Sequence, residues 1–156
     1  MIQRIQSIYL FIASLLIFAL YLFPLLHNVY INGVPSTIKV TGVYQDVNGA
    51  QASTQSFIAL IAVTAIIGLI PLVLIFLYRN RKQQISLCYV AILALIGYSF
   101  WLSQVIKGLI GGASPISFSN YGIGVLLVSI AIILILMAIK AIKNDEKLIK
   151  SADRLR

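Results

Sequence analysis

The chain has 156 residues, of which 60% are hydrophobic and only 10% are charged. Soluble domains carry about 25% charged residues and disordered chains have low hydrophobicity, so the composition excludes both classes and indicates an integral membrane protein. Twelve Lys and Arg against four Asp and Glu leave a net charge of +8. One cysteine excludes a disulfide framework and a cysteine-built zinc site, and we expect Cys88 to be a small core residue.

Four stretches of the chain contain no Asp, Glu, Lys, Arg or His, and each is about long enough to cross a membrane as a helix. They cover residues 8–26, 57–78, 85–106 and 121–139. Their apolar residues do not alternate with polar ones, which excludes the strands of a barrel. The first stretch follows Arg4 like the core of a signal peptide, but no small-residue cleavage site follows it, so we predict a retained helix.

The sequence therefore predicts an all-α membrane protein, a single domain over residues 1–156 whose four transmembrane helices form an up-down bundle. We expect helices at about residues 5–27, 57–78, 85–106 and 121–150, outer loops at 28–56 and 107–120, and a tail at 140–156.

The basic residues indicate how the helices are oriented. One side of the four stretches holds ten Lys and Arg with three Asp and Glu, a net charge of +7, and the other side holds only Lys39 and Lys107 with Asp46. Because Lys and Arg of short loops stay in the cytoplasm, both termini are predicted to be cytosolic. A nucleic-acid surface is disfavoured, since the basic segments contain no aromatic residue apart from Tyr78 at their boundary.

The first outer loop carries strand and turn signals. Asn-Gly pairs at 32–33 and 48–49 follow β-rich runs at 29–31 and 38–44, which predicts two short strands and a small antiparallel sheet. An isolated hairpin is marginally stable in water, so we expect the sheet to lean on the second outer loop or on a partner. In that second loop, Asn120 or Ser119 is expected to cap the fourth helix.

The helical period continues past the fourth apolar stretch. One stripe of the continuing helix is apolar, at Ile139, Ile142, Ile149, Ala152 and Leu155. The remaining positions carry most of the bases, at Lys140, Lys143, Lys147, Lys150 and Arg154. The tail is therefore predicted to be a basic amphipathic helix.

The apolar stretches offer little catalytic or transport chemistry. Coupling to protons or ions needs an ionisable group at membrane depth, and none is present; their Ser and Thr residues are expected to bond carbonyls of their own or a neighbouring helix. His27 and Asp46 are the only starting point for a hydrolase or metal site, and two residues in a loop do not define one. We predict no enzyme activity, no metal and no cofactor. Spaced small residues such as Thr64 and Gly68 leave a homo-oligomer open.

The two ends of the chain resemble a known family. The start Met-Ile-Gln-Arg-Ile-Gln and the end Asp-Glu-Lys-Leu-Ile-Lys-Ser-Ala-Asp-Arg-Leu-Arg are similar to small bacterial membrane proteins grouped as domain of unknown function 4293. The resemblance covers essentially the whole chain in length and layout. It implies a location in the inner membrane of Bacteroidota-type bacteria and assigns no activity, catalytic residue or cofactor.

Two functional hypotheses follow. The first is a non-enzymatic membrane scaffold whose basic cytosolic tail docks a protein partner, with binding of the tail to the anionic membrane surface as the competing interpretation. The second is a small transporter or channel subunit for a neutral or lipid-like substrate. The residues expected to contact the partner or lipid are Arg4, Arg79, Arg81, Lys82, Lys143, Lys147, Ile149, Lys150, Asp153, Arg154 and Arg156.

Overall fold

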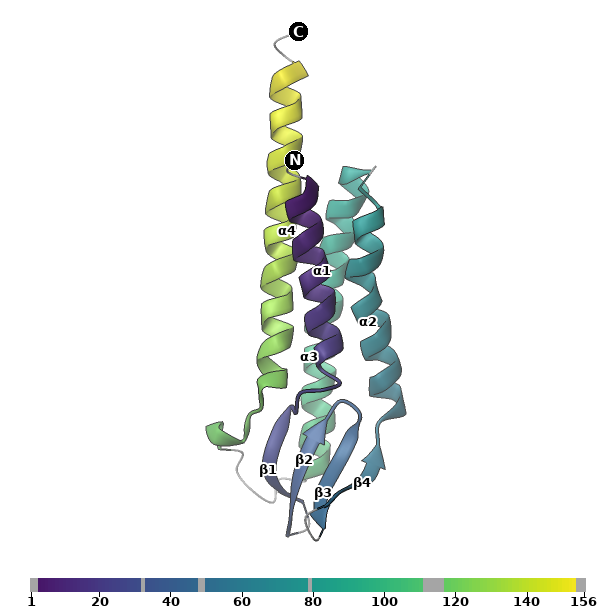
Figure 1. Cartoon of the computed structure of the whole chain (residues 1–156), viewed down its shortest axis with the longest axis vertical. Coiled ribbons are helices and arrows are strands. Elements are labelled where there is room, and N and C mark those ends of the chain that lie inside the picture. The colour runs from purple at the N-terminus through teal and green to yellow at the C-terminus, as the bar shows by residue number, and fades with distance from the viewer. Residues whose placement is uncertain (1–2, 32, 48–49, 79, 111–116, 154–156) are drawn as a thin grey trace.

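The computed structural model describes residues 3–31, 33–47, 50–78, 80–110 and 117–153. In chain order its elements are α1 (Gln3–Ala19), β1 (Leu26–Ile31), β2 (Val34–Lys39), β3 (Gly42–Val47), β4 (Ala50–Ser56), α2 (Ile58–Phe76), α3 (Arg81–Ile110), the short 3-10 helix η1 (Phe118–Asn120) and α4 (Ile123–Asp153). The four α-helices run side by side, and the sheet lies across one end of them (Figure 1). We call this the sheet end. The opposite end, which holds the start of α1, the α2–α3 turn and the end of α4, is the terminal end.

The prediction of four transmembrane helices in a plain up-down bundle is wrong. A four-stranded sheet separates α1 from α2 in the chain. Three helices are long and apolar enough to cross a membrane, at Ile58–Phe76, Arg81–Ile110 and Ile123–Leu148. α1 has 17 residues, and at 1.5 Å per residue it reaches about 25 Å, short of the ~30 Å hydrocarbon core.

α1 ends at Ala19, well before the predicted end at residue 27, because of Pro24. Proline has no amide hydrogen, and it also disfavours helical geometry in the residue before it. The chain first tightens, with backbone bonds from Leu20 to Ile17 at 3.2 Å and from Leu22 to Ala19 at 3.0 Å. Such three-residue spacing is typical of a helix that is ending. The chain then becomes extended, and β1 starts at Leu26.

The sheet is an antiparallel meander in the order β1-β2-β3-β4. Its β-rich run at 38–44 is not one strand, as predicted, because the chain reverses between Lys39 and Gly42, which pair with each other. β4 was not predicted. Its sequence, Ala-Gln-Ala-Ser-Thr-Gln-Ser, has one β-branched residue, Thr54, and no aromatic residue, so it carries little of the composition that marks strands. As an edge strand it pairs with β3 alone.

Backbone hydrogen bonds join the sheet to the start of α4. The Gly122 amide donates to the Leu25 carbonyl at 2.8 Å, and the Gly124 amide donates to the Pro24 carbonyl at 3.0 Å. The Asn120 side-chain amide donates to the carbonyls of His27 and Asn28 at 3.1 and 2.9 Å. The sheet is therefore held by hydrogen bonds to the second outer loop, as expected. Asn120 does not cap α4 as expected, since its side-chain nitrogen bonds β1 and its side-chain oxygen accepts from the Ser117 amide.

Hydroxyl groups connect the helices where they pack. Ser14 of α1 donates to the Gly68 carbonyl of α2 at 2.7 Å. Thr64 of α2 donates to the Leu60 carbonyl at 2.7 Å and lies 2.6 Å from the Tyr98 hydroxyl of α3. The Thr64 hydroxyl has one hydrogen, so Tyr98 donates to Thr64. These bonds confirm the expected role for Ser14 and Thr64.

Alanine at Gly122 tests the junction between the sheet and α4. Its Cβ would overlap the Pro24 carbonyl oxygen, so we expect Gly122→Ala to lower the free energy of unfolding by about 1–3 kcal/mol. The measurement is the midpoint of thermal unfolding in detergent, followed by circular dichroism. Gly97→Ala is the control, because nothing lies within 4 Å of its new Cβ, and equal midpoints for the two variants would contradict the interpretation.

The pair of Thr64 and Tyr98 offers a second test. Thr64→Val leaves the buried Tyr98 hydroxyl without its acceptor, and we expect a loss of about 1 kcal/mol in the free energy of unfolding in mixed micelles. Adding Tyr98→Phe removes the stranded hydroxyl, so the double variant should be no less stable than Thr64→Val alone. Strictly additive losses would show that the two hydroxyls do not interact.

Candidate functional site

The basic residues of the chain gather at the terminal end. The start of α1, the turn between α2 and α3 and the end of α4 all lie there (Figure 1). By position in the chain, these segments carry ten of the twelve Lys and Arg and three of the four Asp and Glu, which leaves +7. The fold therefore brings three separate stretches of sequence to one end of the molecule, where Arg81, Lys82, Lys143 and Lys147 are among the bases whose burial the structure describes.

A polar hollow of about 480 Å³ lies on this surface between the α2–α3 turn and α4. Its lining residues are Asn80, Arg81, Lys82, Gln83 and Glu146. Lys82 and Gln83 are exposed, and Arg81 is half-buried. Two of the residues predicted to bind a partner, Arg81 and Lys82, are thus brought next to α4.

The other predicted contact residues differ in their surroundings. Lys143 is exposed, but its Nζ donates to the Tyr89 hydroxyl of α3 at 2.9 Å and lies 5.4 Å from the ring centroid, so it also fastens α4 to α3. Lys147 is exposed. Four further residues lie in α1 or α4 with side chains outside the described part of the structure, namely Arg4, Ile149, Lys150 and Asp153. Arg79, Arg154 and Arg156 lie outside the described residues altogether.

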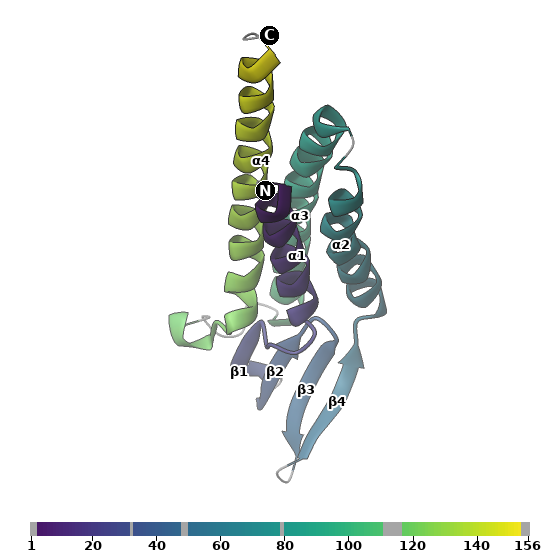
Figure 2. The same cartoon turned by 45° about the horizontal axis from the view of Figure 1, so that its top comes forward.

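α4 continues beyond the start of α1 at the terminal end (Figures 1 and 2). Ile142 is fully buried, so this part of the predicted apolar stripe packs within the bundle and is not open to a partner. Among the residues whose burial the structure describes, Asp145 is the last buried one, and Leu148 is 56% exposed. From Asp145 to Asp153 the helix extends for about 12 Å. It has no proline, and its last glycine is Gly124, so nothing in its sequence kinks it there.

Three buried polar side chains at this end were not anticipated. Gln6 of α1, Gln84 of α3 and Asp145 of α4 are at most 7% exposed, and each has a side-chain oxygen without a hydrogen-bond partner among the described residues. The Gln84 side-chain nitrogen donates to the Leu74 carbonyl at 2.9 Å, at the end of α2. The sequence signal for their burial is a spacing of three and four residues from the buried apolar residues of the same helix. In α4, for example, Asp145 continues the stripe formed by Ile135, Ala138 and Ile142.

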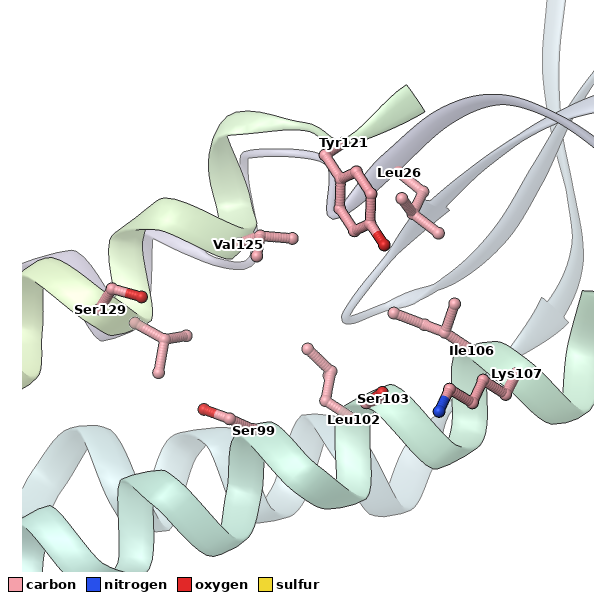
Figure 3. Close-up of a pocket in the computed structure, with 10 residues that line it drawn as sticks. Leu26, Ser99, Leu102, Ser103, Ile106, Lys107, Tyr121, Val125 and Ser129 are labelled. Atoms are coloured by element: carbon pink, nitrogen blue, oxygen red, sulfur yellow. The ribbon is translucent and has the colours of Figure 1, made fainter. Parts of the chain in front are cut away.

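A second cavity, of about 240 Å³, lies between α3 and α4 near the sheet end (Figure 3). Its buried walls include Leu26, Leu102 and Val128, and its exposed rim includes Lys107 and Tyr121. We call it the α3–α4 crevice. Its full lining is Leu26, Ser99, Leu102, Ser103, Ile106, Lys107, Tyr121, Val125, Val128 and Ser129.

Three serine hydroxyl groups line this crevice, in addition to the hydroxyl of Tyr121 at its rim. Ser99 and Ser103 come from α3 and Ser129 comes from α4, on the facing walls of Figure 3. Ser99 donates to the Leu95 carbonyl at 2.8 Å, whereas Ser103 and Ser129 are exposed. From the sequence, each of these serines was expected to bond a backbone carbonyl, with no shared site. The four-residue steps from Ser99 to Ser103 to Lys107 place them on one face of α3 and were the available signal.

The remaining sequence candidates, His27 and Asp46, lie on strands that are not neighbours. His27 lies in β1 and Asp46 in β3, with β2 between the two strands. The side chain of Asp46 is outside the described part of the structure. Cys88 is fully buried in the core of the helices, as expected.

Comparison with known proteins agrees with the resemblance seen at the two ends of the chain. The family model described as Domain of unknown function (DUF4293) matches residues 2–155. Neither a curated protein nor a solved structure matches the chain. The family match covers nearly every residue and brings no activity or site residue with it. The chain belongs to the DUF4293 family, whose function is unknown.

Proposed function

We propose that the protein is a non-enzymatic membrane scaffold whose terminal end docks an acidic protein partner. The observation that carries the proposal is the straight extension of α4 past the bundle, beside the polar hollow formed with residues 80–83. A segment that only fixed the orientation of the protein would need bases, but it would need neither an ordered helix nor a hollow next to it.

The distribution of charge supports a cytosolic position for this surface. Helices that are long and apolar enough to cross a membrane lead into it, and it holds ten of the twelve Lys and Arg. Bases in short loops and near the ends of spanning helices are retained in the cytoplasm. We therefore propose a protein of the bacterial inner membrane whose terminal end faces the cytosol.

The chemistry of the surface selects the partner. A net charge of +7 attracts acidic groups over several ångströms and speeds their encounter with the surface. Lys82 and Lys147 are exposed and accessible, and Leu148 adds an exposed apolar side chain next to Lys147 in the chain. An acidic helix or loop with a few apolar residues would match this combination.

Binding of the tail to the membrane surface is the competing interpretation. A helix that lies on lipid runs in the plane of the interface, so α4 would have to bend where it leaves the bundle. It has no glycine or proline in that region, and packing of α4 against the bundle continues as far as Asp145. A straight α4 carries its last two turns away from the bilayer, which favours a protein as the occupant.

A transporter or channel subunit is the second proposal, and the α3–α4 crevice is the observation that bears on it. From Ser99 to Lys107 the crevice extends for about 12 Å along α3, less than half of the ~30 Å hydrocarbon core. A cavity of that depth accommodates a bound molecule and does not by itself form a path across the membrane. We therefore place this function second.

Photocrosslinking in cells tests the docking proposal. A photoreactive amino acid at Gln83 or Leu148 should capture the same protein, because both positions lie on the proposed surface. The same amino acid at Phe118, which is 92% exposed at the sheet end, is the control and should not capture it. Captured proteins are identified by mass spectrometry.

A charge reversal then tests the chemistry of that contact. Lys147→Glu should reduce capture from Gln83 by about fivefold or more, the effect expected from one exposed charge pair. Lys39→Glu makes the same change at the sheet end and should leave capture unaltered. If both reversals leave the yield from Gln83 unchanged, or if the captured protein is basic, the proposal is wrong.

A further inference from the structure

We propose that the α3–α4 crevice is a binding site for one anionic phospholipid. The phosphate would pair with Lys107 at the rim, and one acyl chain would occupy the apolar floor. The crevice lies at the sheet end, so this inference is independent of the docking surface at the terminal end and does not rest on it.

The walls of the crevice suit an acyl chain. Leu, Ile and Val side chains from α3, α4 and β1 are five of the ten lining residues, and Leu102 and Val128 at its floor are buried. Its volume of about 240 Å³ is below the roughly 300–1,000 Å³ of pockets that enclose a drug-sized molecule. It therefore has room for part of one chain, with the headgroup outside.

The polar groups of the crevice follow the order of the polar groups of a phospholipid, with an amine at the level of the phosphate and hydroxyls at the level of the ester carbonyls. Lys107 is in the last turn of α3, at the end of an apolar helix, where a lysine amine reaches the headgroup region. Ser103 lies one turn deeper, about 6 Å along the helix, and Ser99 lies another turn deeper. Ester carbonyls below a phosphate would meet the hydroxyls of Ser103 and of Ser129 across the crevice (Figure 3).

The sign of the charge favours an anionic lipid. Lys107 is the one charged side chain among the described residues that line the crevice, and no Asp or Glu accompanies it there. A zwitterionic lipid carries a positive choline group, which would have no carboxylate to pair with here. An anionic lipid with an uncharged headgroup needs only the Lys107 amine to pair with its phosphate. The neighbouring surface is apolar, with exposed Phe100 on α3 and exposed Leu126 and Ile130 on α4, so a lipid reaches the opening more readily than a soluble anion does.

Native mass spectrometry of the full chain tests this site. The protein is reconstituted in bilayers of equimolar phosphatidylglycerol and phosphatidylcholine, extracted in a mild detergent, and weighed with the lipids that remain bound. We expect one phosphatidylglycerol per chain to be retained in preference to phosphatidylcholine. Lys107→Gln should lower the ratio of retained phosphatidylglycerol to phosphatidylcholine by about fivefold, the effect of one base near a membrane surface.

Two matched controls make the result specific. Lys39→Gln removes the same charge at the same end, outside the crevice, and should leave the ratio unchanged. Ser129→Leu fills the crevice and should reduce retention of both lipids, whereas Ser86→Leu, at an exposed position of α3 away from the crevice, should not.

Circular dichroism and elution volume identify any variant that fails to fold, and the lysine pair decides the question if Ser129→Leu does fail. The proposal is overturned if the native chain retains the two lipids equally, or if Lys107→Gln and Lys39→Gln change the ratio to the same extent.

Discussion

The junction between residues 24–25 and residues 122–124 holds the structure together at the sheet end. Two backbone hydrogen bonds join these segments, and they form because Gly122 and Gly124 have no Cβ that would strike the Pro24 carbonyl. The junction fixes the position of α1 relative to α4 along the bundle axis and holds β1 at the sheet end of the helices. It also pairs Leu26 with Tyr121. Both residues line the α3–α4 crevice, so the shape of that cavity depends on a contact between backbones.

The terminal end is organised by buried polar side chains. Gln6, Gln84 and Asp145 each continue an apolar stripe of their helix, and such a residue in an apolar interface penalises alternative registers more than it stabilises the correct one. Gln84 also donates to the Leu74 carbonyl in the last turn of α2, and this carbonyl accepts a second hydrogen bond from the Leu77 amide at 3.3 Å. Together with the Lys143–Tyr89 bond, these contacts hold α4 in place where it leaves the bundle.

The two ends of the molecule therefore offer different chemistry. The terminal end presents many bases and a helix that extends past its neighbours, which suits an acidic macromolecule in water. The sheet end presents one lysine above an apolar crevice with three serine hydroxyls, which suits a single amphiphile from the bilayer. Helices long and apolar enough to cross a membrane separate the two surfaces, so a change in one has no direct electrostatic effect on the other.

Composition and periodicity alone indicated helices able to cross a membrane, the positions of α2, α3 and α4, the asymmetry of charge and the presence of strands between residues 26 and 56. The family was indicated by the resemblance of the two ends of the chain. These properties depend on residue type and local spacing. Tertiary structure decided that α1 stops before Pro24, that the polar segment Ala50–Ser56 pairs as an edge strand, that Asp145 is buried, and that Ser99, Ser103 and Ser129 face one cavity. Each of these depends on which elements pack against one another and on their relative position along the helix axes. Neither hydropathy nor hydrophobic periodicity contains that information.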